Sequence, residues 1–553
     1  MTWQEQLIKE NCLPKPPEPT PNTIDHARWR DIVNRWVEPD VPAMYAALAK
    51  LERDFARYIP KFPDGDFTVF VDINKAEAVE LVLRTLAAHF RVTLEHCVQN
   101  MRRMGVAEKS ILPSDYKGDP LLYLQGTPLL ELFTTTARFA LPEEQRFSGM
   151  WICSPPGRGK TVLLQALVLQ DLSTQASVIM MDSKGDLIEP FRHFRSIKNS
   201  LVTIEPSLEH PLALNPFDLG RKDHTAVGLL EYIFSALLPT GSQLTALQST
   251  LFRCAIRATL CYPSPTIETF REIIQNGVPE EITLPFELRT FFRNEFPDSK
   301  TYGETRKQIQ WRLRLLMENP IVSAMFSAPK TKLNLPLEMA NGKIIIIDAS
   351  RDKLGKDGSR FFQRLIIALV LQAAQQRASL QPYQKRPCFF YIDECASCIA
   401  EDENIAEILD TCRSQRIALI LAHQRLQQIT SPNVRDALQN CAIRFANSDD
   451  DATALAPKLR TTPEALRQPV GHFAVYIRDM GAYTVKVPNY PLSELPQMNP
   501  QERAEHHARM IESYCIDPPP LVKFTWGKGT SQQVPEHTDT NTDDTKMDTG
   551  KDW

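Results

Sequence analysis

The chain has 553 residues, which is too long for a single hydrophobic core, so we expect two or three domains. Apolar residues make up 43% of the sequence and charged residues 24%, the ordinary composition of a globular protein. The net charge of −4 argues against a generally basic nucleic-acid binder, although it allows a basic surface confined to one channel or face.

No apolar run reaches the length of about 20 residues that a membrane-spanning helix needs, and the first residues lack the layout of a signal peptide. We therefore expect a cytoplasmic protein without a membrane span of its own, which would reach the inner membrane only through a partner. The eleven cysteines are odd in number and scattered, as expected for reduced thiols. Cys395 and Cys398 have C-x-x-C spacing, but no second pair follows at a distance usual for zinc, so thiols on a helix are the favoured interpretation.

The N-terminal region contains a proline-rich segment, LPKPPEPTPNT, which is typical of an extended arm or linker. Helical periodicity follows at 41–59 and at 76–105, and DFTVFVDI between them is predicted to be a short strand. We interpret residues 1–115 as a small mixed or mostly helical domain of unassigned role.

From about residue 120, short and almost continuously apolar runs recur: MWIC, SVIMMD, KIIIID, CFFYID, IALILAH and CAIRFAN. Strands buried on both faces have this composition, and their alternation with helical patterns indicates a mainly parallel sheet covered by helices. The expected fold class is therefore α/β, with the sheet domain in two parts, 116–221 and 336–495. Several of these runs end in a polar residue, which places polar side chains at the carboxyl ends of the strands. Open α/β sheets bind ligands at that edge.

Residues 222–335 interrupt this alternation, because they are helical in period and poor in strand signals. We interpret them as an all-α domain inserted into the sheet domain. Its last helical pattern carries basic residues, for which a solvated face is favoured over contact with a nucleic-acid backbone: Arg306, Lys307, Arg312 and Arg314. After the sheet domain we expect a helical extension at 496–526 and a disordered acidic tail at 527–553, which lacks aliphatic runs.

The strand MWIC leads into SPPGRGKT, and a helical pattern begins directly after it, which is the context of a phosphate-binding loop. Gly157 and Gly159 would turn backbone N–H groups toward the phosphates, beside the positive end of the helix. Lys160 would reach the β- and γ-phosphates of ATP, and Thr161 would ligate Mg²⁺. Ser154 replaces the first glycine of the pattern, and we expect it to be tolerated because the following prolines preset the turn. The residues assigned to nucleotide binding are Ser154, Pro155, Pro156, Gly157, Arg158, Gly159, Lys160 and Thr161.

The run CFFYIDE has the layout of a Walker B strand. Asp393 would hold Mg²⁺ through water, and Glu394 would polarise the attacking water as a general base. Adjacent acids also occur as a simple strand-end cap, but a phosphate loop in the same domain favours the catalytic interpretation. The next strand delivers Gln424, whose amide would sense the γ-phosphate or orient the water. Just upstream, Arg413 is the candidate to complete a neighbouring subunit's site in a ring ATPase, with a surface or salt-bridged arginine as the alternative.

Taken in order, these stretches resemble the type IV coupling proteins of bacterial conjugation and type IV secretion, the TraG/TraD family within the FtsK/HerA group of P-loop motors. The likeness rests on SPPGRGKT, MMDSKGDLI, LALNPFD, and FFYIDE followed by LDTCRSQRIALILAHQRLQQI, and it covers residues 120–495. It implies a RecA/FtsK-like P-loop ATPase fold, ATP and Mg²⁺ as cofactors, and Asp182 and Lys184 beside the nucleotide.

The resemblance further implies a hexameric ring that moves DNA, or a relaxase-bearing complex, together with a type IV secretion or conjugation apparatus. Typical members of the family begin with transmembrane helices, and this sequence shows none. Two alternatives stay open: a cytosolic HerA-like DNA-processing or packaging translocase, and a nucleotide-binding substrate adaptor with poor turnover. A small-molecule kinase is disfavoured, because the helical insertion is large and the arrangement of Asp393, Glu394 and Gln424 suits attack by water.

Overall fold

The structure is a computed structural model, and it describes residues 67–70, 136–218, 224–235, 246–402 and 404–517. Most of the predicted N-terminal domain, including the proline-rich arm and both predicted helices, lies outside the described residues, as does the predicted acidic tail. The domain boundaries given above therefore stay predictions.

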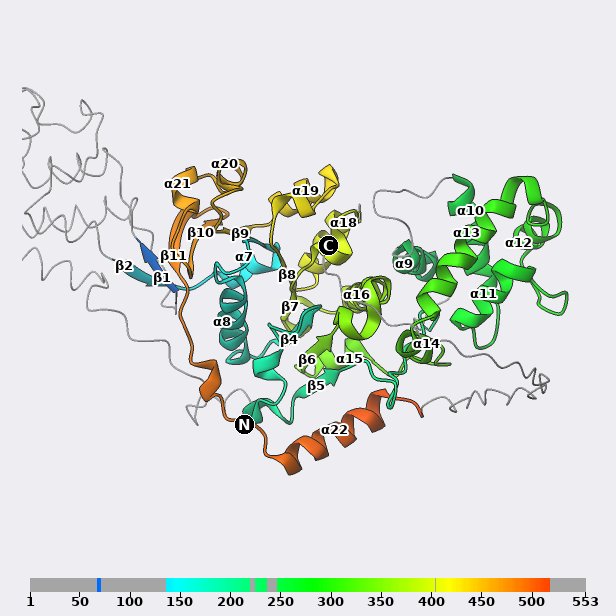
Figure 1. The fold of residues 1–553 in the computed structure, drawn as a ribbon, viewed down its shortest axis with the longest axis horizontal. Helices are drawn as coiled ribbons and strands as arrows, with labels where there is room; N and C mark the ends of the chain where they lie inside the picture. Colours follow the sequence, from blue (N-terminus) through cyan, green and yellow to red (C-terminus); the bar gives the residue numbers. More distant parts are fainter. Residues whose placement is uncertain (1–66, 71–135, 219–223, 236–245, 403, 518–553) are drawn as a thin grey trace, which may run out of the picture. The chain divides into compact units, whose positions relative to one another are not determined.

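A sheet of eleven strands organises the described chain, in the order β2-β1-β11-β10-β9-β3-β8-β7-β4-β6-β5 (Figure 1). The neighbouring strands from β9 to β5 all pair in parallel, whereas β10, β11, β1 and β2 extend the sheet with antiparallel pairs. The prediction of an α/β fold with a mainly parallel sheet is confirmed. The strands are β1 (Phe67–Phe70), β2 (Thr136–Phe139), β3 (Met150–Cys153), β4 (Ser177–Asp182), β5 (Leu201–Ile204), β6 (Ile344–Asp348), β7 (Cys388–Ile392), β8 (Ile417–His423), β9 (Ile443–Ala446), β10 (His472–Ile477) and β11 (Gly481–Lys486).

Both faces of the parallel strands are buried, and alternate residues of each strand belong to different hydrophobic clusters. In β4, Val178 and Met180 pack with α8, whereas Ile179 and Met181 pack with α16 and α18 on the other face. This period of two explains why both residue sets must be apolar, and hence why these strands are continuous apolar runs. The helices beside the sheet are α7 (Glu143–Phe147), α8 (Lys160–Leu172), α16 (Arg351–Gln376), α17 (Ala396–Ile399), α18 (Ile405–Ser414), α19 (Pro432–Gln439), α20 (Ala452–Leu455) and α21 (Pro463–Leu466).

Between β5 and β6, the described residues form helices and no strand. Buried Asn215, from the NPF element, fixes the base of this segment: its Nδ2 donates to the carbonyls of Pro265 (2.8 Å) and Pro329 (2.9 Å). Its Oδ1 accepts from the Phe217 N–H at 2.9 Å. The entry, the middle and the exit of the segment are therefore joined through one amide. The helices are α9 (His224–Phe234), α10 (Ala246–Thr259), α11 (Ile267–Asn276), α12 (Phe286–Thr290), α13 (Ser299–Met317), α14 (Pro320–Phe326) and α15 (Leu335–Ala340).

The C-terminal helix α22 (Pro500–Tyr514) packs against β5 at the edge of the sheet. It begins with a capping box in which Asn499 and Glu502 satisfy each other's backbone N–H groups. Glu502 also receives Lys198 at 2.6 Å and Arg195 at 3.1 Å. The helix thus closes the edge that β5 would otherwise leave exposed.

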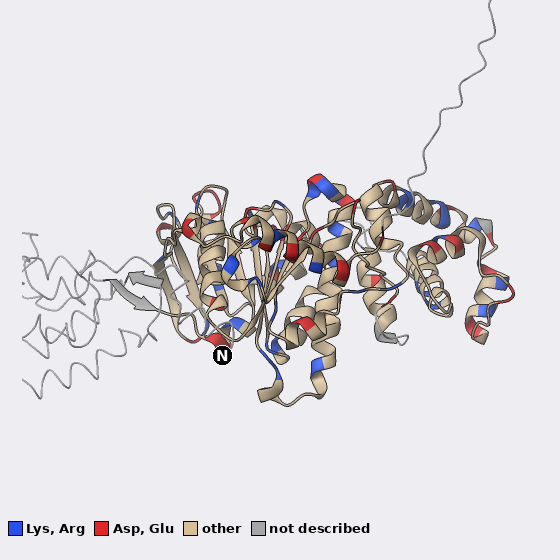
Figure 2. Cartoon of the chain, turned by 90° about the horizontal axis from the view of Figure 1, so that it is seen from below, with Lys and Arg blue, Asp and Glu red and all other residues tan. Residues whose placement is uncertain are grey.

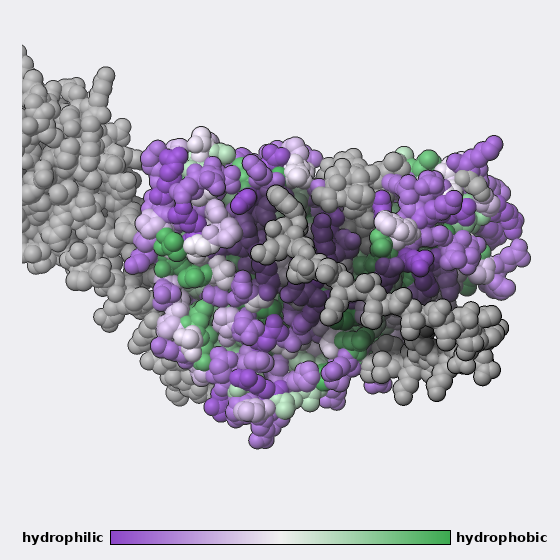
Figure 3. Space-filling model, in the orientation of Figure 1, coloured by the Kyte–Doolittle hydropathy of each residue, from purple (hydrophilic) through white to green (hydrophobic). Residues whose placement is uncertain are grey.

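Basic and acidic residues are mixed over the part of the chain that the structure describes. Figure 2 shows basic and acidic residues interspersed along the described elements, in keeping with the net charge of −4. The face drawn in Figure 3 is mostly hydrophilic, with small separate apolar areas. Among the described helices, none is both long enough and apolar enough to span a membrane.

Candidate active site

The phosphate loop links the end of β3 to the start of α8, and its glycines have conformations that other residues adopt poorly. Gly157 has φ 78° and Gly159 has φ 96°. A Cβ atom at Gly159 would lie 3.2 Å from the backbone of Gly471, closer than most Cβ atoms approach a neighbour, so the Gly471 backbone would have to shift. Ser154 is fully buried, and its φ is not positive. Its N–H donates to the His423 carbonyl at 3.1 Å. The position that departs from the usual pattern therefore does not need glycine.

The segment 447–472 packs against the phosphate loop and forms a wall beside it. The sequence analysis did not assign this segment to the site. The Arg158 guanidinium pairs with Asp449 and donates to the Gln468 carbonyl at 3.3 Å. The Arg158 carbonyl accepts from the Gly471 N–H at 3.1 Å. Asn447, fully buried, holds this wall by donating to the carbonyls at its base. The segment 447–472 meets the phosphate loop only because of the tertiary fold, so no local sequence pattern could predict the contact.

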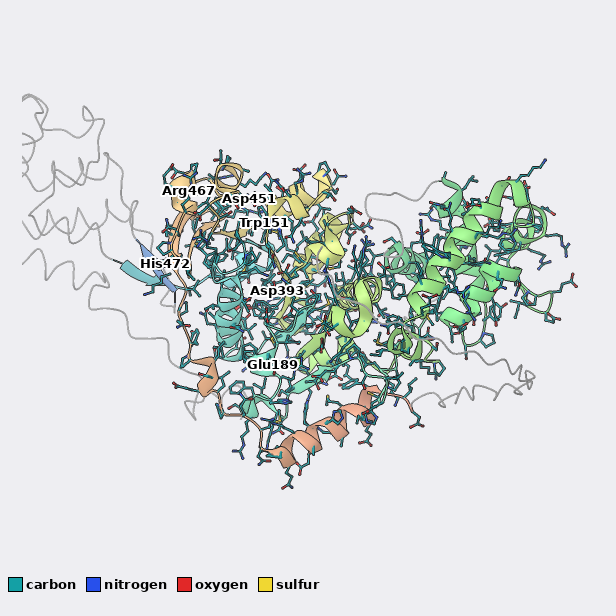
Figure 4. The ribbon with its side chains drawn as sticks, viewed as in Figure 1. Trp151, Glu189, Asp393, Asp451, Arg467 and His472 are labelled. Atoms are coloured by element: carbon teal, nitrogen blue, oxygen red, sulfur yellow. The ribbon has the colours of Figure 1, made fainter. Side chains whose placement is uncertain are left out.

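The polar ends of β3, β4, β7 and β8 meet around one carboxylate. The Lys160 ammonium pairs with Asp393 and lies 3.1 Å from Glu394 Oε1. The same oxygen accepts from Lys184 Nζ at 2.9 Å and from Gln424 Nε2 at 2.5 Å. Figure 4 labels Asp393 in the middle of the sheet domain; it directly follows β7. The structure thus brings together five residues that the sequence analysis had assigned to catalysis or nucleotide binding.

The backbone of Glu394 is held in a strained conformation. Its φ is 53°, a left-handed value that costs a residue with a side chain about 1–2 kcal/mol. Two hydrogen bonds maintain the turn: Asp393 Oδ1 accepts the Glu394 N–H at 2.8 Å, and Ala422 O accepts the Cys395 N–H at 2.9 Å. Such strain persists where the surroundings over-determine it, and it is concentrated at functional sites.

Charge and burial set the protonation states of this cluster. Burial disfavours the charged form of Lys160, but Asp393 and Glu394 more than offset this effect and raise its pKa above the ordinary value. Burial would also raise the pKa of Glu394. The charge of Lys160 and the hydrogen bonds from Lys184 and Gln424 outweigh that effect and lower its pKa overall. At neutral pH the site therefore holds an ammonium group beside an ionised carboxylate.

Asp182 shapes the turn that carries Lys184. It is completely buried at the end of β4, and its two oxygens accept the N–H groups of Lys184 and Leu187, each at 2.8 Å. Because these bonds fix the turn, the half-exposed Lys184 side chain reaches Glu394. Asp182 thus acts on the turn, whereas Lys184 belongs to the polar cluster itself.

Buried residues next to Gln424 hold the backbone that carries it. His423 lies between Trp151, whose Nε1 is 2.8 Å from its Nε2, and the Arg425 carbonyl, 3.0 Å from its Nδ1. Burial lowers the pKa of His423 to about 4, so the ring is neutral at pH 7. Gln428 Oε1 accepts the backbone N–H groups of Gln424 and Arg425, both at 2.9 Å. The sequence analysis missed these supporting residues.

The structure does not bring Arg413 into this cluster. It lies exposed in the last turn of α18, before β8 begins, whereas Gln424 follows the opposite end of that strand. It lines a surface cavity of about 560 Å³ with Asp410 and Arg478. Arg416 lines the same cavity but is engaged within the chain: it pairs with Glu143 at 2.9 Å and stacks over a phenyl ring. Any contact of Arg413 with a nucleotide would have to involve a second copy of the chain.

Two oxygen donors suit a small divalent cation. Thr161 is the second residue of α8, and the Asp393 carboxylate reaches the adjacent Lys160. The described residues contain no group of three or more His, Cys, Asp and Glu placed to hold a metal. This donor set fits Mg²⁺, which is usually bound by one or two protein oxygens together with substrate phosphates.

Cys395 and Cys398, which follow β7, are buried. Burial raises the pKa of the Cys398 thiol to about 12 and raises that of Cys395 as well. Both therefore remain thiols rather than reactive thiolates at neutral pH.

No family model matches the sequence, and no curated protein matches it. Solved structures match the fold: a bacterial conjugative coupling protein, TrwBdeltaN70, in an unbound monoclinic form has a TM-score of 0.50 at 15% identity, with 65% of this chain and 89% of that chain covered. The plasmid coupling protein TrwB in complex with ADP and Mg²⁺ gives a TM-score of 0.50 at 15% identity, covering 66% and 89%. Its complex with the GTP analogue GDPNP gives 0.50 at 15%, covering 65% and 89%. The described chain therefore shares the fold of these structures, a P-loop α/β fold with a mainly parallel sheet, as its motifs had implied.

Proposed function

We propose that this chain is an ATPase that couples ATP hydrolysis to the movement of DNA or of a DNA–protein complex. The observation that carries the proposal is the convergence of Lys160, Lys184 and Gln424 on the Glu394 carboxylate, beside a loop whose two glycines have left-handed φ values. A structural strand cap would not need two ammonium groups and an amide on one oxygen.

Each residue has a distinct role in this proposal. The N–H groups that follow Gly157 and Gly159, at the positive end of α8, bind the phosphates, and Lys160 neutralises the β- and γ-phosphates. Thr161 and Asp393 hold Mg²⁺, which when bound neutralises charge that develops on the phosphates. Glu394, ionised because of its cationic neighbours, takes a proton from the attacking water, and Gln424 orients that water.

The exchange of partners by Lys160 is central to the mechanism. In the described structure its ammonium group is bound by Asp393 and Glu394. An incoming phosphate competes for that ammonium group, and the carboxylate of Glu394 is then released to accept a proton. Nucleotide binding and activation of the base are coupled through this one side chain.

We further propose a ring of subunits, hexameric by analogy with the family that the motifs resemble. Exposed Arg413 would complete the site of the next subunit, whereas Arg416 is already engaged by its own chain. The ring would work in the cytoplasm on DNA or a relaxase-type substrate. A type IV secretion or conjugation apparatus would be its partner, and would provide its contact with the inner membrane.

The test is the steady-state ATPase rate of the full chain, measured without DNA, with single-stranded DNA and with duplex DNA. We expect DNA to stimulate turnover, and the preferred form of DNA distinguishes a conjugative motor from a duplex-packaging translocase. Turnover that is indifferent to both DNAs would contradict a DNA substrate. Tight ATP binding with no turnover would support a nucleotide-binding adaptor instead.

A further inference from the structure

A second polar cavity lies at the edge of the sheet opposite the phosphate loop. It has a volume of about 470 Å³ and is formed by the residues before β4, β7 and β8, together with the end of α16 and the loop 377–387. The phosphate loop and Glu394 lie at the carboxyl ends of the same sheet. β8 is seven residues long, so the two edges are about 20 Å apart. The cavity is therefore separate from the proposed ATP site.

The charged side chains that line this cavity are all basic, and one of them, Arg416, is paired with Glu143 outside the lining. Arg377, Lys385, Arg386 and Arg416 line it, and none of its described lining residues is Asp or Glu. Arg377 is only 6% exposed and donates to the carbonyls of Arg386 (2.9 Å) and Gln415 (3.4 Å) rather than to a carboxylate. Arg386 likewise donates to the Gln175 carbonyl at 2.8 Å. A nearly buried guanidinium without a counter-charge in its own cavity favours an anionic ligand.

The rim of the cavity also carries exposed apolar side chains, which binding of a phosphate ion alone would not need. Tyr383 is 84% exposed and Leu380 is 41% exposed, and both line the cavity on the loop RASLQPYQKRP. An exposed aromatic ring next to a cationic groove is the arrangement on which single-stranded nucleic acids stack a base while the groove tracks the backbone. The cavity volume also falls in the range of sites that hold a nucleotide-sized unit.

We propose that this cavity binds single-stranded nucleic acid, with backbone phosphates at Arg377, Lys385 and Arg386 and a base stacked on Tyr383. This inference deepens the proposed function and rests on it, because it names a contact for the DNA substrate. Recognition is independent of sequence, since every base has a face that can stack. The bound strand lies at the opposite edge of the sheet from the site of hydrolysis.

The experiment measures binding of a fluorescein-labelled oligothymidine to the full chain by fluorescence anisotropy over a series of salt concentrations. Tyr383→Ala should weaken binding about tenfold, the effect of losing one stacked base, and Tyr383→Phe should retain the affinity. Lys385→Gln should reduce the slope of log K against log salt by about 0.7, the value for one lost phosphate contact on a single strand. Both side chains lie on a surface loop, and thermal unfolding confirms that the variants fold.

Matched controls distinguish this cavity from other surfaces. Trp311→Ala removes another exposed aromatic ring, 62% exposed on α13, and Arg271→Gln removes an exposed cation on α11. Neither should change the affinity. Loss of binding in Trp311→Ala but not in Tyr383→Ala would overturn the proposal, as would the absence of oligothymidine binding by the unaltered chain. Equal binding of a duplex with the same variant effects would also overturn it.

Failure of this inference can be told apart from failure of the proposed function. Binding is measured without ATP, and the ATPase rate without DNA is recorded for the same variants. An ATPase that is intact in Tyr383→Ala, with unchanged DNA binding, would reject the cavity and leave the motor standing. Binding of inorganic pyrophosphate that Lys385→Gln weakens, together with no binding of oligothymidine, would identify a small-anion site and reject the proposal.

Discussion

Glu394 is the residue on which the site depends, because one of its oxygens receives three donors and its backbone is strained. Burial alone would raise the pKa of the carboxylate, but the charge of Lys160 and the hydrogen bonds from Lys184 and Gln424 lower it overall, which favours the ionised form. Its neighbours therefore have two effects: they lower the pKa of the base, and they fix the direction in which it points.

Ser154 gives a prediction at the same scale. Its Oγ is buried and has no hydrogen-bond partner among the described residues. Leaving such a group unsatisfied costs about 1–3 kcal/mol, so Ser154→Ala should leave the unfolding temperature unchanged or raise it. ATP affinity, measured by titration calorimetry, should stay the same. A clear loss of ATP affinity would mean that the hydroxyl itself contacts the nucleotide.

His423 makes stability depend on pH. Its pKa is about 4 in the folded chain against an ordinary value of 6.5, so the unfolded chain binds the extra proton between these values. Stability from this residue is complete above pH 6.5 and is lost as the pH falls toward 4. His506, whose pKa is also lowered to about 4, adds a similar dependence.

The variant His423→Gln isolates the first contribution. Between pH 6.5 and pH 5, its free energy of unfolding should fall less steeply than that of the unaltered chain, by up to about 1.4 kcal/mol per pH unit. Chemical denaturation at several pH values measures the difference. Parallel curves for both proteins would contradict a neutral, buried His423.

At the scale of elements, the turn from β3 into α8 is the most constrained part of the chain. Gly159→Ala combines an unfavourable φ of 96° with a Cβ atom 3.2 Å from the Gly471 backbone, so we expect loss of ATP binding and a lower unfolding temperature. Gly157→Ala is the matched control, because its φ is 78° but nothing lies within 4 Å of the added atom. It should cost only the left-handed strain, about 1–2 kcal/mol. Equal effects of the two variants would show that the close approach of Gly471 is unimportant.

The sequence predicts the buried parallel strands well and the edge of the sheet poorly. All six apolar runs form strands, because burial on both faces leaves a composition that few other elements share. β5 is only four residues long and was not assigned. The hairpin of β10 and β11 was not assigned either: Gly481–Lys486 is mostly half-buried and lacks a continuous apolar run, whereas β10 contains such a run, FAVYI, which was missed. β1 was predicted as a strand, but its pairing with β11 depends on contacts distant in sequence.

The same distinction applies to the site. Asp393, Glu394 and Gln424 follow strands directly, and the loop after β3 leads to Lys160 at the start of α8, so the parallel topology places them together. The wall around Gly471 and the buried residues next to Gln424 contribute through backbone carbonyls and buried rings, which no local pattern reveals. Residue type and spacing predict the groups that touch a ligand better than the groups that support them.

In the proposed ring, each ATP site is shared between two neighbouring subunits. Arg413→Ala and Glu394→Gln should each be inactive as ATPases on their own. Mixed together, they should regain part of the activity, because some interfaces then combine an intact Glu394 with an intact Arg413. Steady-state turnover across mixing ratios measures this. An Arg413→Ala variant with full activity would remove the arginine from the mechanism.

The most direct test of the central claim compares nucleotide binding with turnover in Glu394→Gln. The amide keeps the size of the side chain but cannot accept the proton, so ATP should bind as tightly as before while turnover falls at least 100-fold, the lower range for a general base. Lys160→Ala, in contrast, should lose binding itself. This pattern would establish Glu394 as the base of an ATPase, whereas turnover in Glu394→Gln at the rate of the unaltered chain would contradict the account.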